Sequence, residues 1–257
     1  TWLKPSEQDP LTHQKIVELA ELAGLPPGVL NVVHGGRETV ESVCDHPDIV
    51  GVSFVGSSHV ARVVHTRASA SGKRVQALGG AKNYMIVLPD ADMDAALEAC
   101  SASIFGSTGQ RCLAGSVIVG VGDAHAQIRD RMLDSAASIR LGDGLQPDTD
   151  MGPVISVAHR DRINDFIQQG ASDGAKLSLD GRGATVEGLP GGYWVGATVF
   201  EDVPPDASIA TEEVFGPVAG INRAKDIDEA VRMMHASRYG NACSIFTTSG
   251  KAARDRK

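Results

Sequence analysis

Short β-rich runs alternate with segments of helical periodicity, and this alternation constrains the fold more than any other feature. In the first 80 residues the runs GVLNVVHG, IVGVSFVGS and KRVQAL are separated by helical patterns. Strands that alternate with helices are typical of a parallel sheet that helices cover on both faces. The sequence therefore predicts an α/β fold with such a sheet. The first helical pattern extends from about Leu11 to Ala23. The second follows Gly36 and ends at about Cys44, and the third extends from about Ser58 to Ala70.

The pattern changes after the sequence GGAKN, which begins at Gly79. The next segment, YMIVLPDADMDAALEACSASIFG, predicts a strand, a turn and a helix with Asp90 or Asp92 as its N-cap. Further strands are expected in SVIVGV, AKLSLDG and ACSIFTTS, and helices in DAHAQIRDRMLDSAASI, AHRDRINDFIQQGA and DIDEAVRMMHAS. The segments ATVFEDV and FGPVAGINR lie between AKLSLDG and DIDEAVRMMHAS. We therefore predict two domains, residues 1–80 and 81–257, with the boundary near Leu78 to Ala81.

The charge balance and the cysteine spacing argue against several classes of protein. A net charge of −8 and an isoelectric point near 5.4 are unlike a nucleic-acid-binding protein, which usually carries a basic patch. No apolar run approaches the ~20 residues of a membrane helix, and the start of the sequence does not resemble a secretory signal. The four cysteines form no CxxC pair, so we expect no metal site and no disulfide framework. A cytoplasmic metabolic enzyme with no nucleic-acid or membrane partner is favoured.

Cys112 lies in FGSTGQRCLAGS, a run of small residues at the foot of an apolar helical pattern. A free thiol has a pKa near 8.5 and is only a few per cent ionised at neutral pH, so a nucleophilic cysteine needs a local positive field. Arg111 provides a permanent positive charge beside it. These residues leave a nucleophile and a buried cysteine both open. We expect Cys44, Cys100 and Cys243 to be small buried hydrophobic residues.

Two stretches in the first 80 residues are candidates for binding a nucleotide. Gly56 and Ser57 end the run SFVGS just before a helical pattern, and a helix N-terminus after a parallel strand suits a phosphate. Lys4 and Glu7, in LKPSE, could hydrogen-bond a ribose, and the carboxylate of Glu7 would repel a 2′-phosphate. This favours NAD over NADP. From the residues alone, a plain strand–helix turn and a solvated loop stay open for the two stretches.

A third candidate lies in TEEVFGPV, where two glutamates precede a Phe-Gly-Pro corner. Glu213 could bind a ribose hydroxyl, and Phe215 could pack against a flat ring. A capped turn with a core aromatic residue is the alternative for this motif.

The chain resembles the aldehyde dehydrogenase superfamily through seven motifs in the family's order and spacing: LKPSEQDP, SFVGSS, GGAKN, FGSTGQRCLAGS, MGPVIS, EEVFGPV and YGNACSIFTTSG. Several motifs in register are more specific than any one alone. CDHPDIVGVSFVGS, AKNY, GQRC and YGNACSIFTTSG are most similar to the CoA-acylating methylmalonate-semialdehyde dehydrogenase branch. The resemblance implies an aldehyde dehydrogenase-like fold: part of a Rossmann-type parallel-sheet NAD-binding domain, residues 1–80, and an α/β catalytic domain, residues 81–257, truncated at its C-terminal end.

The resemblance also implies roles for individual residues. Cys112 matches the nucleophile, which attacks an aldehyde to give a thiohemiacetal and, after hydride transfer to NAD⁺, a thioacyl enzyme. We expect Arg111 to bind the carboxylate of a short semialdehyde, since a guanidinium can hold a carboxylate through two hydrogen bonds. The cofactor positions are Lys4 and Glu7 at the adenosine ribose, Gln8 where this branch usually has an arginine beside the cofactor, Gly56 and Ser57 at the pyrophosphate, and Glu213 and Phe215 at the nicotinamide ribose and ring.

The implied reaction is NAD-dependent oxidation of a methylmalonate- or malonate-type semialdehyde, with CoA as the co-substrate that receives the acyl group. Hydrolytic members of the superfamily carry a glutamate ahead of the paired glycines. Leu78 stands at that position here, and no acidic residue occurs from Val60 to Pro89. A hydrolytic enzyme that releases a free acid, and a non-catalytic fragment that binds nucleotide or a partner chain, stay open as alternatives.

The length of the chain is a departure from the family, because it is roughly half of the family's usual length. The family's oxyanion-hole asparagine would precede Thr1, and its last catalytic strand and oligomerisation arm would follow Lys257. We therefore expect a longer protein that forms a homo-oligomer, a dimer or a tetramer.

Overall fold

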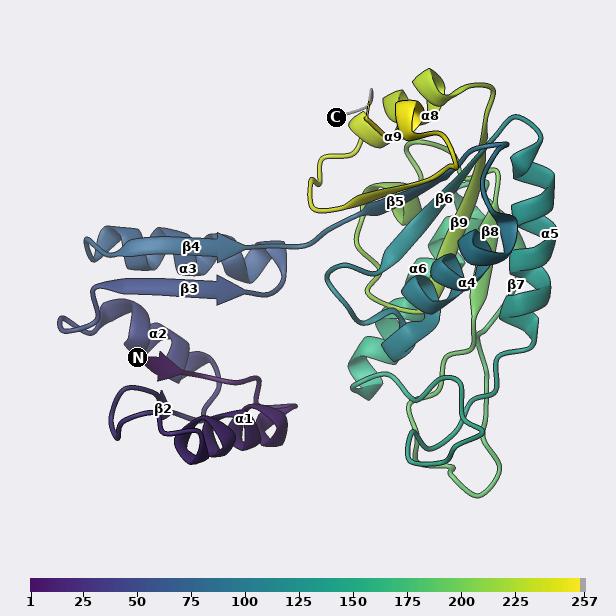
Figure 1. The fold of residues 1–257 in the computed structure, drawn as a ribbon. Helices are drawn as coiled ribbons and strands as arrows, with labels where there is room; N and C mark the ends of the chain where they lie inside the picture. The colour runs from purple at the N-terminus through teal and green to yellow at the C-terminus, as the bar shows by residue number, and fades with distance from the viewer. Residues whose placement is uncertain (255–257) are drawn as a thin grey trace. The chain divides into compact units, whose positions relative to one another are not determined.

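The computed structural model describes residues 1–254, and Figure 1 shows its ribbon. The chain divides into two compact units, Thr1–Gly80 and Ala81–Lys257. Each unit has its own strands and helices, and each has its own core and its own candidate residues. No helix among these 254 residues is long and apolar enough to cross a membrane.

The first unit contains two pairs of parallel strands, β1 with β2 and β3 with β4. The prediction of a single sheet is wrong for the described residues, because each pair forms a separate two-stranded sheet. β2 is short because Gly28 adopts a φ of 83° and a turn occupies the first half of its apolar run. Cys44, Val64 and Ala68 are buried against β3 and β4. The elements are β1 (Trp2–Leu3), α1 (Pro10–Leu22), β2 (Asn31–Val32), α2 (Arg37–Asp45), β3 (Gly51–Val55), α3 (Ser58–Ala70) and β4 (Arg74–Leu78).

The second unit is built on a six-stranded sheet with the order β10-β5-β6-β9-β8-β7. All neighbouring strands are parallel except β7, which runs antiparallel to β8 because no helix lies between these consecutive strands. The strands are β5 (Asn83–Val87), β6 (Gly115–Val121), β7 (Lys176–Leu179), β8 (Thr198–Glu201), β9 (Val218–Ala224) and β10 (Cys243–Phe246). The helices are α4 (Met93–Phe105), the 3₁₀ helix η1 (Gly106–Gly109), α5 (Ala124–Ala137), α6 (Val157–Ser172), α7 (Ser208–Thr211), α8 (Ile227–His235) and α9 (Gly250–Arg254).

Helices cover both faces of the six-stranded sheet, and β5 is therefore buried along its whole length. Successive side chains of a strand point to opposite faces. Met85 and Val87 pack with residues of α4 and α5, whereas Ile86 packs with residues of α8 on the other face. The two helix layers and the parallel strands agree with the predicted α/β fold.

The helix boundaries are close to those predicted from periodicity, but two short elements were not foreseen. Asp92, rather than Asp90, caps α4, and its side chain accepts hydrogen bonds from the backbone N–H groups of Asp94 and Ala95. The 3₁₀ helix η1 and the one-turn helix α7 carry no clear periodicity because each is only four residues long. The sequence SGKAARDRK has the pattern of the start of a helix, and α9 begins in it at Gly250, while its last three residues lie outside the described residues.

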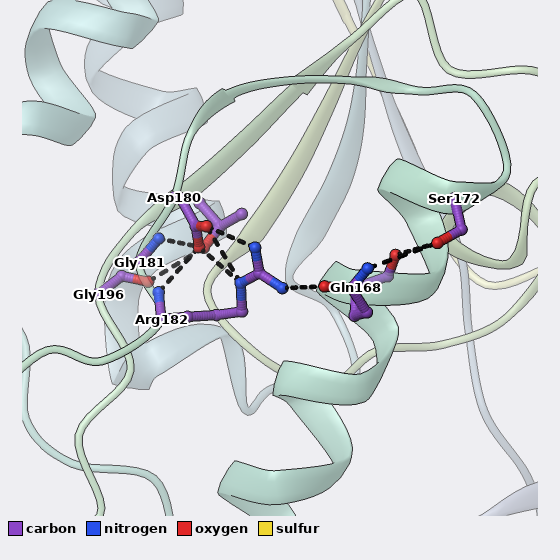
Figure 2. A network of polar contacts seen from close by, with 7 residues as sticks. Gln168, Ser172, Asp180, Gly181, Arg182 and Gly196 are labelled. Carbon is purple, nitrogen blue, oxygen red and sulfur yellow. Dashed lines mark hydrogen bonds and ion pairs between the residues drawn. The ribbon is translucent and has the colours of Figure 1, made fainter.

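The C-terminal half of α6 is fixed by the long loop between β7 and β8 (Figure 2). Arg182 in that loop forms an ion pair with Asp180 and donates a 2.8 Å hydrogen bond to Oε1 of Gln168 on α6. Gly181 and Gly196 approach so closely that a Cβ on Gly181 would lie 2.0 Å from the carbonyl oxygen of Gly196. The loop thus supports the C-terminal half of α6. These contacts leave the N-terminal half of the helix available to contact another part of the second unit.

Candidate active site

Cys112 lies on an exposed turn between η1 and β6. The turn is closed by a 3.0 Å hydrogen bond from the backbone N–H of Ala114 to the carbonyl oxygen of Arg111. A buried position, one of the two possibilities open for Cys112, is not what the structure has. The thiol is placed where a small molecule in solvent can reach it.

The segment before this turn has an unusual backbone that other residues hold in place. Ser107 and Thr108 adopt positive φ values of 51° and 57°, which non-glycine residues rarely do. The hydroxyl of Thr108 donates a 3.0 Å hydrogen bond to the carbonyl oxygen of Gly152. Gln110 accepts one of 3.0 Å from the backbone N–H of Ile155. The MGPVIS motif, which contains Gly152 and Ile155, therefore supports the approach to Cys112.

The other cysteines differ in exposure. Cys44 and Cys100 are buried as predicted, and burial raises the pKa of both thiols, that of Cys100 to about 12. The prediction that Cys243 is buried is wrong. It begins β10, an edge strand that pairs with β5 on one side only, so part of its surface is uncovered. Partial desolvation nevertheless raises the pKa of the Cys243 thiol.

Two asparagine amides meet at the carbonyl oxygen of Cys112. Nδ2 of Asn83, the first residue of β5, donates a 2.9 Å hydrogen bond to it, and Nδ2 of Asn241 donates one of 2.8 Å. Neither asparagine was predicted to have a role, although they lie in the motifs AKNY and YGNACSIFTTSG. Only their presence in these motifs could have drawn attention to the two asparagines, because neither periodicity nor charge distinguishes them.

Arg111 extends its side chain across the end of α4. Its Nε donates a 3.0 Å hydrogen bond to the hydroxyl of Ser107. A Cβ on Gly106 would lie 2.9 Å from Nη1 of Arg111, so the glycine leaves room for the guanidinium. Within residues 1–254 no carboxylate forms an ion pair with Arg111, and the guanidinium is available to an anionic ligand.

Glu213 and Phe215 lie on the loop between α7 and β9. Glu213 is half-buried, and this burial raises the pKa of its carboxyl above the usual value, while its Oε1 accepts a 3.0 Å hydrogen bond from the backbone N–H of Ala81. Phe215 adopts a φ of 58°. Nε2 of His159, on α6, donates a 2.7 Å hydrogen bond to the carbonyl oxygen of Phe215. α6 therefore holds the loop through its main chain at Phe215.

Lys82 is buried beside this loop, with its Nζ 3.0 Å from the carbonyl oxygen of Glu212. Burial lowers the pKa of the Lys82 ammonium to about 8, although the charges of Glu213 and Glu212 oppose that shift. Lys82 lies in the motif GGAKN but was not predicted to have a role. Its place under the loop follows from long-range packing, which local pattern does not reveal.

A narrow cavity lies between the turn that carries Cys112 and the loop that carries Glu213. Arg111, Glu213 and Phe215, three of the predicted site residues, all contribute to its wall. The other lining residues are Ala81, Asn83, Gly109, Ala114, Gly115, Ser116, Val214, Gly216 and Val218. Residues about 100 positions apart in the sequence therefore converge on one space in the second unit.

The remaining predicted residues belong to the first unit. Ser57 is the N-cap of α3, and its hydroxyl accepts a 3.4 Å hydrogen bond from the backbone N–H of Val60. Gly56 precedes it at the end of β3, and a Cβ there would lie 2.6 Å from the ring of Phe54. The strand–helix turn predicted from SFVGSS is therefore present, and its helix begins at Ser58.

Lys4 and Glu7 form an ion pair of 3.1 Å in the exposed loop after β1. The pKa of the Glu7 carboxyl is lowered by its own backbone N–H group first and by Lys4 second, so it is a carboxylate at neutral pH. Gln8 follows in the same loop with an exposed side chain, and its backbone N–H donates to the hydroxyl of Ser6. These residues are accessible to a ligand in the first unit.

Residues 1–256 match the model of the aldehyde dehydrogenase family. A malonate-semialdehyde dehydrogenase from Geobacillus kaustophilus is 47% identical over 98% of this chain and 51% of its own length. The Arabidopsis thaliana protein named methylmalonate-semialdehyde dehydrogenase [acylating], mitochondrial, is 48% identical over 98% of this chain and 41% of its own length. This chain spans about half the length of such curated relatives.

Solved structures with a similar fold carry names of the same kind as these relatives. A Sinorhizobium meliloti 1021 crystal structure, provisionally named a methylmalonate-semialdehyde dehydrogenase and complexed with NAD, superimposes with a TM-score of 0.94. The two chains are 43% identical, and the match covers 99% of this chain and 52% of the other. A methylmalonate-semialdehyde dehydrogenase from Oceanimonas doudoroffii gives a TM-score of 0.93 at 41% identity, over 99% and 52% of the two chains. Because the family model spans nearly every residue and the fold agrees, the chain belongs to the aldehyde dehydrogenase family.

Proposed function

We propose that this chain carries the nucleophile and part of the cofactor site of an NAD-dependent, CoA-acylating semialdehyde dehydrogenase. The observation that carries the proposal is the exposed thiol of Cys112, which lies on a turn beside a cavity lined by Arg111, Glu213 and Phe215. Burial would have removed the thiol from any substrate. The names of the Arabidopsis and Geobacillus relatives support the same class of reaction.

The residues present suit a dinucleotide. The N-terminus of the 13-residue helix α3, capped by Ser57, offers backbone N–H groups to a phosphate, and the Glu7 carboxylate can accept hydrogen bonds from ribose hydroxyls. Glu213 would bind the second ribose and Phe215 would pack against the nicotinamide ring. NAD⁺, when bound, supplies the hydride acceptor for the oxidation. The NAD complex of the Sinorhizobium structure supports this choice of cofactor.

The proposed chemistry of Cys112 has two stages. Its thiolate attacks the aldehyde carbon, and a C–S bond forms while the carbonyl oxygen gains the electron pair. Oxidation of that carbon by two electrons leaves a thioester on Cys112. The thiolate of CoA then attacks the thioester carbon, the bond to Cys112 breaks, and the sulfur of Cys112 leaves as a thiolate. The cysteine ends in the state in which it began, as a covalent catalyst must.

Arg111 is the proposed contact for the substrate's carboxylate. Its guanidinium has one hydrogen bond, to Ser107, and in the described part of the chain it has no acidic partner. A carboxylate held bidentately beside Cys112 would place the aldehyde carbon near the sulfur. We expect Arg111→Lys in the full-length gene product to raise the KM of carboxylated aldehydes and to leave simple aldehydes little changed. An equal loss with both classes of aldehyde would assign Arg111 a structural role.

The experiment that tests the whole proposal measures NADH formation by the full-length gene product with malonate semialdehyde, NAD⁺ and CoA. Turnover that disappears in Cys112→Ser is the expected result. A Cys112→Ser variant that retains wild-type turnover would refute the proposed role of the thiol.

The alternatives lead to different products. A hydrolytic enzyme would release a free acid, and a non-catalytic fragment would bind nucleotide without forming NADH. Homo-oligomerisation and a cytoplasmic location stay predictions, and the Arabidopsis relative is named as mitochondrial.

A further inference from the structure

We propose that Asn83 and Asn241 are positioning residues for the thiol of Cys112, a role that rests on the proposed function of Cys112 as the nucleophile. Their side-chain amides meet at the carbonyl oxygen of Cys112, with Nδ2 distances of 2.9 Å and 2.8 Å. A carbonyl oxygen has two lone pairs, so these two donors occupy both of its acceptor positions. Two segments 158 residues apart in the sequence thus hold the main chain of one cysteine.

Asn83 makes the stronger structural connection because it is buried, with only 4% of its surface exposed. Its Nδ2 also donates a 2.8 Å hydrogen bond to the carbonyl oxygen of Ala114, and its Oδ1 accepts one of 3.1 Å from the backbone N–H of Ala242. Exchanging the amide oxygen and nitrogen would turn the oxygen toward two carbonyl groups, so the network permits one orientation. Asn83 therefore connects the turn that carries Cys112, and the segment before β10, to the buried strand β5.

The turn that carries Cys112 depends on such contacts because it is short and exposed. The backbone bond that closes it joins Ala114 to Arg111. The segment before it has left-handed φ values at Ser107 and Thr108, a conformation that the surrounding contacts must maintain. Anchoring the carbonyl oxygen of Cys112 fixes the turn at the residue that bears the thiol.

Asn241 connects the same turn to the loop that carries Glu213. Arg238 and Tyr239, in the segment with Asn241, both donate to Oε2 of Glu212, at 2.5 Å and 3.4 Å. Arg238 also lies 5.0 Å from the ring centre of Tyr239. A single set of polar contacts therefore joins the position of Cys112 to that of the neighbouring Glu213.

Positioning matters because the sulfur must bond to the aldehyde carbon and then leave the same carbon. A misplacement of about 1 Å can cost about 100-fold in rate. Loss of one anchor should therefore slow the chemical step. Asn241 is exposed and is not among the residues proposed to bind NAD, so its loss should change neither folding nor the KM for NAD⁺.

The test compares single-turnover NADH formation in variants of the full-length gene product. Asn241→Ala should lower the rate constant at least about tenfold, with the KM for NAD⁺ within about twofold of wild type and an unchanged melting temperature. Asn241→Ser, which keeps a short donor, should recover part of the rate, whereas Asn241→Asp, of equal size but without an amide donor, should not. Asn164→Ala is the control, because Asn164 lies on α6 and lines a different cavity.

Three results would overturn the positioning role. One is an Asn241→Ala rate within about twofold of wild type. Another is a rate that falls together with the melting temperature and is not recovered in Asn241→Ser, which indicates general destabilisation. The third is a wild type without NADH formation whose Cys112 is the slowest of the four cysteines to be alkylated, because then the proposed function itself fails. Only the first two leave the proposed function standing, so the two failures can be told apart.

Discussion

Arg162, on α6, donates a 2.8 Å hydrogen bond to the carbonyl oxygen of Glu213. Its other terminal nitrogen donates one of 2.7 Å to the carbonyl oxygen of Val214, and its guanidinium lies 4.7 Å from the ring centre of Phe166. The main chain beside Glu213 is thus held by a planar cation with two donors in fixed geometry. A lysine has the charge but not this geometry. α6 therefore holds the main chain from which the Glu213 side chain extends.

We expect Arg162→Lys and Arg162→Ala to lower the free energy of unfolding by about 1–2 kcal/mol, because hydrogen bonds from a charged donor are lost. Urea unfolding followed by circular dichroism measures the change. Arg160→Ala is the matched control, since Arg160 pairs with its neighbour Asp161 on the same helix. Equal effects of the Arg160 and Arg162 variants would contradict a specific role for the two carbonyl contacts.

The four cysteines should differ in their rates of reaction with iodoacetamide. Cys112 is exposed and next to Arg111, whereas the pKa values of the Cys44, Cys100 and Cys243 thiols are all raised by burial. A raised pKa lowers the thiolate fraction at neutral pH, so Cys112 should react first. Mass-spectrometric mapping after brief alkylation at pH 7.5 gives the order. Cys243 is the informative comparison because it too is exposed, and faster labelling of Cys243 would contradict the expectation.

The buried ammonium of Lys82 predicts a specific dependence of stability on pH. Burial lowers its pKa from 10.5 to about 8, so between these values the unfolded chain binds more protons than the folded one. The free energy of unfolding should therefore rise with pH across this window. The full difference corresponds to about 3 kcal/mol. Lys82→Met should remove this rise, which urea unfolding at pH 7.5, 8.5 and 9.5 would detect. Parallel pH profiles of variant and wild type would show that Lys82 does not cause it.

The sequence predicted the fold well where one element suffices to define a pattern. The helix from Ser58 to Ala70 follows from local periodicity, and capping chemistry reduced the N-cap of α4 to Asp90 or Asp92, of which the structure uses Asp92. The division of the first unit into two sheets was missed because strand pairing depends on which segments meet in space, and Gly28 shortened β2. Cys243 was expected to be buried because a free cysteine is usually a small buried hydrophobic residue, yet the sheet order puts it on an edge strand.

The candidate site divides in the same way. Cys112 and Arg111 could be singled out because unusual residue types stand together in a small-residue loop. Asn83, Asn241 and Arg162 could not, because what matters is which carbonyl oxygen each side chain reaches. Those contacts join residues between 29 and 129 positions apart, and no local pattern encodes them.

Glu7 should set the preference between the two nicotinamide cofactors. Its carboxylate stays charged at neutral pH because its own backbone N–H and Lys4 lower its pKa, and it would repel the 2′-phosphate of NADP⁺. Glu7→Gln should raise kcat/KM for NADP⁺ relative to NAD⁺ in the full-length gene product. Glu18→Gln is a matched control, because Glu18 forms the same type of pair with Lys15, three positions earlier on α1. An unchanged cofactor ratio in Glu7→Gln would contradict this role.

The acceptor of the acyl group is the most consequential difference between the proposed function and its hydrolytic alternative. Water needs a general base to attack a thioester, which is worth about 10²–10⁴-fold in rate. Leu78, half-exposed at the end of β4, stands where the resemblance places that base, and no acidic residue occurs from Val60 to Pro89. Glu212 is the other acid to consider, and its carboxylate already accepts a 2.5 Å hydrogen bond from Arg238.

A CoA thiol needs less help than water does, because a few per cent of it is thiolate at neutral pH and thiolates are strong nucleophiles. Sustained NADH formation from a semialdehyde and NAD⁺ should therefore require CoA, after at most one turnover per active site without it. The product should be an acyl-CoA, which chromatography of the reaction mixture identifies. Leu78→Glu should add CoA-independent release of free acid if the position is the one that the resemblance indicates. Fast, sustained turnover of the wild type without CoA would show that another group activates water and would favour the hydrolytic alternative.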